Sequence, residues 1–310
     1  MARKAKKKKA TTANKKISKT EKLQKVATKE SKTPNKENEN WLSPRAITLL
    51  VIIFIITQGA GLFVAHLLFL EGAQVAPITD NINDIENAIY LFVVIMVMTA
   101  IILIALKLRR TTKFLWFIEA LAIFSTCIIT FSALLPAGDL IVLLITALVL
   151  YMRYWKRENI LIRDIAGIIA IIGSGAYIGI SLGIFPVLAF IIALAIYDLI
   201  AVFYTKHMVE MGKAVTKSNF AFTIAMPTKK HRFELGNGDL VIPLIVAASI
   251  LTNGPFINNS LIAGLCAIVS FIGLLFSIYS VGKWKRPMPA LPPQTLLMVI
   301  VIIAGLLLGA

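Results

Sequence analysis

The sequence predicts an all-α polytopic membrane protein with nine transmembrane helices. Three observations support this fold class: 58% of the 310 residues are hydrophobic, the mean hydropathy is +0.82, and long apolar runs recur along the chain. A helix of roughly 20 apolar residues crosses a bilayer core. No soluble globular domain could bury this proportion of apolar surface, so the composition excludes a water-soluble enzyme.

The first 45 residues differ in composition from the rest of the chain. They hold 15 of the 32 Lys and Arg residues and almost no large apolar side chains, which predicts a disordered basic tail in the cytoplasm. Contact with anionic lipid headgroups is favoured over nucleic-acid binding as the role of this charge. The segment is too long and too polar to be a cleaved signal peptide, and it has no small-residue cleavage site.

Nine apolar runs follow the tail. Six lie within residues 46–205 and form predicted helices one to six, and three lie within residues 233–310 and form helices seven to nine. A cytoplasmic loop, residues 206–232, separates the two groups. The runs cover roughly residues 46–70, 88–106, 114–135, 139–155, 164–183, 185–205, 233–252, 260–280 and 291–309. The seventh is the weakest, because two glycines and two acidic residues interrupt its start.

Basic residues alternate between the two sets of connections. The loops that hold all 17 remaining Lys and Arg residues lie near 107–113, 153–163, 206–232 and 282–288. The loops that hold none lie near 71–87, 136–139, 183–186 and 253–259. The positive-inside rule therefore predicts a cytoplasmic N-terminus and, with nine spans, a C-terminus outside the cell.

Two features of the spans are assigned to packing. Gly175, Gly179 and Gly183 recur at four-residue spacing, a stripe of small residues that lets another helix approach closely. The only cysteines, Cys127 and Cys266, both lie in apolar runs. We expect them to be small buried residues with no disulfide between them.

Ionisable residues inside membrane spans are rare and are candidates for function. Asp139 and Asp164 lie at the starts of their runs, where a carboxylate is expected to cap free backbone N–H groups. Glu119 follows Lys113 in the third run, and we expect it to extend toward that lysine at the membrane interface. Two aspartates remain without such an explanation.

Asp198 and Asp239 are expected to lie at one depth. Asp198 precedes the end of the sixth run by six residues, and Asp239 lies six residues inside the seventh, so each is about 9 Å from the cytoplasmic surface. Three interpretations remain open: a hydrogen bond between helices with a shared proton, a proton- or cation-coupled transporter, and an aspartic-protease dyad. In a dyad one carboxylate removes a proton from water while the other polarises the scissile carbonyl.

The glycines beside Asp239 favour the protease. A substrate helix must unwind before its peptide bond is hydrolysed, and its freed amides need new partners, because each unsatisfied amide in lipid costs several kcal/mol. Gly236 and Gly238 have no side chain to block a close approach. An extended substrate could therefore lie along this backbone just before Asp239, in the manner of strand addition.

Three motifs resemble those of the presenilin and signal peptide peptidase proteases. The YD motif corresponds to Tyr197-Asp198, the GxGD motif to Gly236-Asn237-Gly238-Asp239, and the PAL motif to Pro289-Ala290-Leu291. Their order, their spacing and the predicted helix count agree with the family over roughly residues 46–310. YD or PAL alone is a weak signal, but the three motifs in their proper helices are highly specific.

The resemblance implies a presenilin-like fold and an intramembrane aspartic endopeptidase that cuts transmembrane helical peptides or signal peptides in the lipid bilayer. Asp198 and Asp239 would be the catalytic pair, and Pro289-Ala290-Leu291 would pack near them. Proline lacks a donor N–H, so the Pro-rich approach to the ninth helix cannot be regular helix, and it leaves carbonyls free to bond a substrate strand.

The compact chain is most similar to microbial (archaeal) members of the family, which implies the cell membrane of a microbe. The 206–232 loop lacks the long insert of an animal presenilin. Obligate accessory subunits are therefore not implied, and a homo-oligomer remains open.

We expect no metal and no cofactor. His66, His207 and His231 are isolated and the sequence has no H-E-x-x-H motif, which excludes a site-2-type metalloprotease. His66 is the only histidine within a span, and no motif connects it to a serine such as Ser260, so a rhomboid-type dyad is poorly supported. The alternative function is the transporter that would use the same two aspartates.

Overall fold

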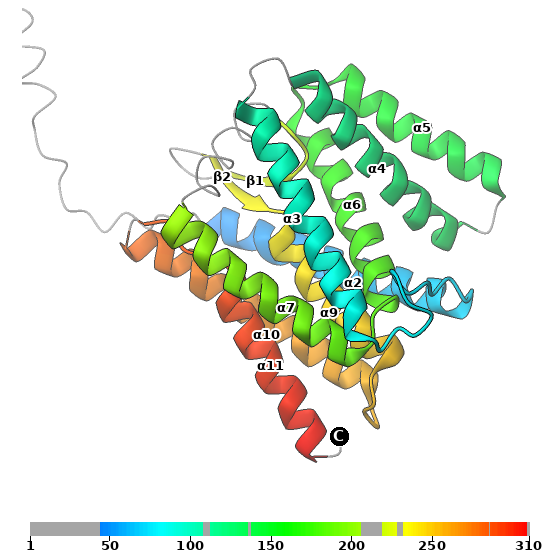
Figure 1. The fold of residues 1–310 in the computed structure, drawn as a ribbon. Coiled ribbons are helices and arrows are strands. Elements are labelled where there is room, and N and C mark those ends of the chain that lie inside the picture. The colour runs from blue at the N-terminus through cyan, green and yellow to red at the C-terminus, as the bar shows by residue number, and fades with distance from the viewer. Residues whose placement is uncertain are drawn as a thin grey trace, which may run out of the picture. The chain divides into compact units, whose positions relative to one another are not determined.

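The computed structural model describes residues 44–107, 112–135, 138–205, 219–227, 232–284 and 286–308. Within these ranges it contains nine α-helices, a short π-helical segment and a two-stranded sheet (Figure 1). The helices are α2 (Pro44–Leu70), α3 (Ile85–Lys107), α4 (Thr112–Leu134), α5 (Asp139–Trp155), α6 (Ile160–Ile180), α7 (Ile184–Ile200), α9 (Gly238–Asn253), α10 (Asn259–Trp284) and α11 (Leu291–Leu308). The π-helical segment η1 (Ala201–Thr205) continues α7. Most of the predicted basic tail and of the predicted 206–232 loop lies outside the described residues.

The prediction of an all-α fold with nine helices is confirmed, one helix for each predicted run. Seven of the helices in the described ranges are long and apolar enough to cross a membrane. The two others are shorter, with 17 residues in α5 and 16 in α9. Several helices begin a few residues before the predicted run, because the polar residues that flank a span can continue the helix beyond its apolar part.

The predicted start of the seventh span, at residue 233, is wrong. Strand β2 (Arg232–Gly236) occupies this position and pairs antiparallel with β1 (Thr223–Pro227), so that part of the predicted loop is also strand. The helix begins only at Gly238. Glycine is a poor helix former, and pairing with β1 satisfies the backbone of β2 without a helix.

The hairpin of β1 and β2 is amphipathic. Ile224 and Leu235 are opposite each other in the register, and with Met226 they are buried in one cluster with Leu50 of α2 and Leu240 of α9. Alternate residues of a strand point to opposite faces, so the other face carries the polar residues of the hairpin. The hairpin is therefore fixed against the helices beside the start of α9.

Helix α9 lies in the centre of the helix bundle, in contact with α2, α6, α7 and α10 (Figure 1). Buried residues occupy nearly all of its circumference, from Leu240 to Ile250. A helix that is apolar all round is typical of such a central position. Helices α4 and α5 lie beyond α6 at one side of the bundle, and α11 packs on α10 and α7.

Two of the predicted packing glycines face α9. A methyl group at Gly175 would lie 2.6 Å from Leu244, and one at Gly179 would lie 2.5 Å from the Cβ atom of Ala248. The packing role is therefore confirmed for these two residues. Gly183 lies outside α6 as the N-cap residue of α7, where its N–H donates to the carbonyl of Ile82 at 2.9 Å.

Both cysteines are buried and free, as predicted. The predicted capping roles of two aspartates are wrong. Helix α6 begins at Ile160, before the predicted run, whereas α5 begins at Asp139 as predicted but has no side-chain cap. Asn159 caps α6, with its side-chain oxygen accepting from the N–H of Leu161 at 3.0 Å, and Asp164 lies beyond the first turn. Asp139 is the first residue of α5, after the N-cap residue Gly138, so it contributes charge near the helix dipole rather than the cap.

Gly179→Ala should destabilise the protein, because the new methyl group would also lie 2.8 Å from the carbonyl oxygen of Ile245, which belongs to the backbone and cannot rotate away. Overpacking of this kind costs about 1–3 kcal/mol. The matched control is Gly264→Ala in α10, where the methyl group meets nothing within 4 Å. Thermal unfolding in detergent should show a lower melting temperature for Gly179→Ala alone, and equal melting temperatures would refute the close approach of α6 and α9.

Candidate active site

Asp198 lies near the end of α7 and Asp239 at the beginning of α9. Asp198 lies in the last turn of α7 with only 6% of its surface exposed, and Asp239 lies half-buried in the first turn of α9. The two helices contact each other. The chain thus places an acidic residue on each of two neighbouring helices in an apolar bundle.

The Pro289-Ala290-Leu291 stretch meets this pair through its backbone. The N–H of Leu291 donates to Oδ2 of Asp198 at 3.3 Å, and the N–H of Ala290 also interacts with this carboxylate. Pro289 is buried, and its carbonyl accepts from the hydroxyl of Ser277 at 3.5 Å. Leu291 is the first residue of α11, so its N–H has no acceptor within the helix and is free to bind a carboxylate.

Tyr197 precedes Asp198 on α7 and is half-buried. Helix α7 thus supplies Tyr197 and Asp198, α9 supplies Asp239, and α11 supplies the N–H of Leu291. The hydrogen bond from Leu291 to Asp198 joins two of the three sequence motifs.

The segment before Asp239 connects the hairpin to α9. The backbone N–H of Asn237 donates to the carbonyl of Phe222 at 3.1 Å, and its side-chain amide donates to the carbonyl of Ala221 at 2.8 Å. Gly238 is exposed, and a Cβ atom there would meet nothing within 4 Å. A Cβ atom at Gly236 would lie 3.6 Å from Oδ2 of Asp239. The backbone leading to Asp239 is thus fixed on one side by Asn237 and open at Gly238.

Two further features near Asp239, a proline and a glutamine, were not predicted from the sequence. Pro243 lies inside α9 and has no N–H, so the carbonyl of Asp239 lacks the donor that the helix would otherwise supply. Gln58 of α2 donates its amide to the carbonyl of Leu240 at 3.0 Å. A glutamine and a proline inside apolar runs are the signals that could have identified them.

The predicted interfacial role of Glu119 is wrong. Glu119 is 1% exposed and forms an ion pair of 2.8 Å with Arg153 of α5, which is fully buried, instead of extending toward Lys113. Its carboxylate also accepts from the N–H of Ala221 at 3.2 Å, and Arg153 donates to the carbonyl of Asn219 at 2.7 Å. The pair thus holds the segment that leads into β1.

A second charged cluster holds the polar face of the hairpin to α6. Arg163 forms ion pairs with Asp164 at 2.9 Å and with Glu234 of β2 at 3.4 Å. Asp164 accepts from the N–H of Ala225 in β1 at 3.3 Å, and the hydroxyl of Thr223 donates to Glu234 at 2.5 Å. Both strands are therefore tied by charge to the helices that surround α9.

No group of three or more His, Cys, Asp or Glu side chains in the described part of the chain is arranged to hold a metal ion. His66 is exposed on α2, and His207 and His231 lie outside the described residues. The site contains two carboxylates, and carboxylates are groups that can act as general acid or general base.

These features define an integral multi-pass membrane protein with an acidic pair inside its helix bundle. Residues 51–310 match the model of the family described as signal-peptide peptidase, presenilin aspartyl protease, and the chain belongs to this family of aspartic-type endopeptidases.

The fold is also similar to solved structures of a presenilin family intramembrane aspartate protease. One, in a C222 crystal form, has a TM-score of 0.62 and 22% sequence identity, and the match covers 84% of this chain and 99% of that chain. Another, in a P2 crystal form, has a TM-score of 0.58 and 23% identity, with coverage of 83% and 96%. A comparison with curated protein sequences gives no match.

Glu119→Ala should strongly destabilise the protein, because it leaves the guanidinium of Arg153 buried without its ion-pair partner. Breaking a buried ion pair in this way costs about 3–5 kcal/mol. Glu71→Ala, which removes an exposed carboxylate after α2, serves as the control and should leave the melting temperature unchanged. If the two variants melted at the same temperature, the buried pair would not anchor the hairpin.

Proposed function

We propose that this protein hydrolyses peptide bonds within transmembrane segments of membrane proteins or within signal peptides, with Asp198 and Asp239 as its catalytic pair. One observation carries the proposal: in a chain of this family, the neighbouring helices α7 and α9 each carry one of these aspartates, and the N–H of Leu291 donates to Asp198.

The proposed chemistry requires the two carboxylates to lie close together. Two like charges a few ångströms apart do not both ionise readily, so the pair works with one shared proton. The ionised carboxylate takes a proton from water as it attacks the scissile carbonyl, and the protonated one donates to the carbonyl oxygen. When the tetrahedral intermediate collapses, the carboxyl group that took the water proton gives it to the leaving amine. The other carboxylate takes back its proton from a hydroxyl of the intermediate as the carbonyl re-forms, so the pair regains its initial state. These roles belong to the pair and not to either residue alone.

The substrate would lie along the backbone from β2 to Gly238. A substrate strand needs hydrogen-bond partners once its helix has unwound, and the hairpin is a small sheet of only two strands. The open space at Gly238 leaves room for a second backbone next to Asp239. Gly236 adds to this room, because any side chain there would lie beside the carboxylate.

The topology in the membrane belongs to the same proposal. The alternation of basic loops supports a cytoplasmic N-terminus, an external C-terminus and a cytoplasmic 206–232 segment between helices one to six and seven to nine. The enzyme would act in the cell membrane of a microbe. Obligate accessory subunits are not part of the proposal, because the 206–232 loop lacks the long insert of an animal presenilin.

Asp198→Ala and Asp239→Ala should each abolish cleavage of a single-span substrate by purified protein in detergent. Loss of one acid–base group lowers the rate by about 10²–10⁴-fold. Asp139→Asn, an exposed aspartate at the start of α5, is the matched control and should keep normal turnover. Near-normal turnover of either alanine variant would refute the dyad. Proton-coupled flux in liposomes, lost in both variants and without proteolysis, would instead establish the transporter.

Gly238→Leu should abolish cleavage and leave the protein folded. The leucine side chain would enter the open space before Asp239 and displace the substrate, and a displacement of about 1 Å can cost about a hundredfold in rate. The fold should tolerate it, because leucine is a better helix former than glycine by up to about 1 kcal/mol. Gly264→Leu, at another glycine with open space, controls for the added bulk. Melting temperature and cleavage rate are measured on one preparation, and a stable, fully active Gly238→Leu would contradict the substrate path.

A further inference from the structure

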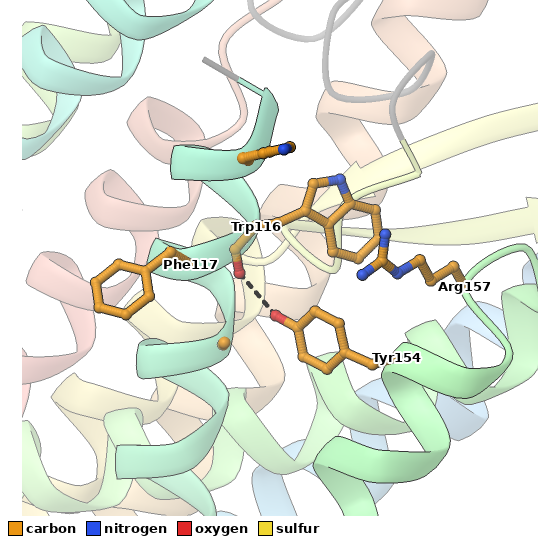
Figure 2. Close-up of a pocket in the computed structure, with 6 residues that line it drawn as sticks. Trp116, Phe117, Tyr154 and Arg157 are labelled. Carbon is orange, nitrogen blue, oxygen red and sulfur yellow. Dashed lines mark hydrogen bonds between the residues drawn. The ribbon is translucent and has the colours of Figure 1, made fainter. Parts of the chain in front are cut away.

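A pocket of about 390 Å³ lies between the beginning of α4 and the end of α5 (Figure 2). Its volume is in the range of small-molecule binding sites. The residues that line it are Lys113, Trp116, Phe117, Ala120, Tyr154 and Arg157. None of them takes part in the proposed cleavage chemistry, so the pocket requires its own explanation.

The walls of the pocket are fixed in place. Lys113, Trp116, Phe117 and Ala120 recur at the spacing of one face of a helix, so they form a single wall along α4. The hydroxyl of Tyr154 donates to the carbonyl of Trp116 at 2.7 Å, and the centroids of these two rings are 5.7 Å apart (Figure 2). The end of α5 is thereby joined to the first turns of α4.

Positive charge gathers at one end of this pocket. The guanidinium of Arg157 lies 4.9 Å from the ring centroid of Trp116 and 5.4 Å from that of Tyr154 (Figure 2). Lys113 and Arg157 are both exposed, and no carboxylate among the described residues forms an ion pair with either. Arg153, which also stacks on Trp116 at 4.8 Å, differs because Glu119 neutralises it. Two cations therefore remain available to a ligand.

The other end of the pocket is apolar and faces outward. Phe117 is 63% exposed, and Ala120 lies one turn farther from the beginning of α4. Tyr151 and Trp155 are 56% and 71% exposed on α5, beside the basic end. Tryptophan and tyrosine gather at the level of lipid headgroups, so this end of α4 and α5 has the composition of a membrane interface. A ligand that fits both ends carries an anionic group and an apolar chain.

We infer that this pocket binds an anionic phospholipid, with its phosphate between Lys113 and Arg157 and an acyl chain along Phe117 and Ala120. Arginine and lysine are the usual partners of phosphate, and basic pockets between transmembrane helices bind anionic headgroups. A free phosphate would use the two cations but leave the apolar wall empty. A zwitterionic lipid would cover the apolar wall but bring a second positive charge toward the two cations.

The test uses the purified full chain in an uncharged detergent. Phosphatidylglycerol or phosphatidylcholine with the same acyl chains is added in increasing amounts, and the melting temperature and the lipid adducts seen by native mass spectrometry are recorded. A ligand that binds only the folded state raises the melting temperature with its concentration. We expect phosphatidylglycerol to raise it by a few degrees and to form a one-lipid adduct, and phosphatidylcholine to do neither.

Substitutions then locate the lipid. Arg157→Gln and Lys113→Gln should each weaken the phosphatidylglycerol adduct by about tenfold, since each charged hydrogen bond to phosphate is worth about that factor. Two variants are used because Arg157 also contacts both rings, and each is first shown to melt cooperatively without lipid. Lys283→Gln is the matched control, because Lys283 is likewise exposed at the end of a helix and lies 5.8 Å from the ring of Tyr279.

Three outcomes would overturn the inference. An equal effect of phosphatidylcholine would show that the charge of the headgroup is irrelevant. An equal weakening of the phosphatidylglycerol adduct in Lys283→Gln would show that the lipid is attracted to the basic surface in general and not to this pocket. The same shift produced by inorganic phosphate would assign the two cations to a soluble anion. The lipid site is supported if phosphatidylglycerol alone binds and if only Arg157→Gln and Lys113→Gln weaken its adduct.

Discussion

A backbone that leaves helical structure inside a membrane protein must find other hydrogen-bond partners, because unsatisfied amides in lipid are costly. The chain meets this requirement next to Asp239 with the β1–β2 hairpin and with Asn237, whose backbone and side chain both donate to the residues before β1. Two buried ion-pair clusters, around Arg153 and Arg163, then fix the hairpin to α4, α5 and α6. These groups fix the hairpin and Asn237 next to the open backbone at Gly238.

The position of helix α9 depends on close packing with its neighbouring helices. Leu244 occupies the space that a methyl group would take at Gly61 of α2 and at Gly175 of α6, so two neighbouring helices approach α9 from different sides. Close van der Waals packing of this kind stabilises helix association in lipid, where the hydrophobic effect contributes little. The tight packing of α9 positions Asp239 at its first turn, and the position of Asp198 follows from the contact between α7 and α9.

Much of this architecture is predictable from the sequence, and the exceptions have physical causes. Apolar length and the alternation of basic loops predicted nine helices, and the packing roles of Gly175 and Gly179 followed from their spacing. The β2 strand was missed because its residues continue into an apolar run, and apolar content does not distinguish a short strand from a helix. The partner of Glu119 was missed because Arg153 lies 34 positions away, and spacing along one helix carries no information on pairs between helices. The pairing of Asp198 and Asp239 stays a proposal, which rests on their places in consecutive antiparallel spans.

The hydrogen bond from the N–H of Leu291 to Asp198 has a consequence for how the protein is made. The donor lies 93 positions after its acceptor and belongs to the last helix, and Gly273 lets the backbone of that helix at Gln294 approach α10 closely. A ribosome releases the two aspartates long before it releases α11. The emerging chain therefore holds both carboxylates before the amide that completes their surroundings has been synthesised. Assembly of the site therefore has to wait until α11 has been synthesised and has packed on α10 and α7.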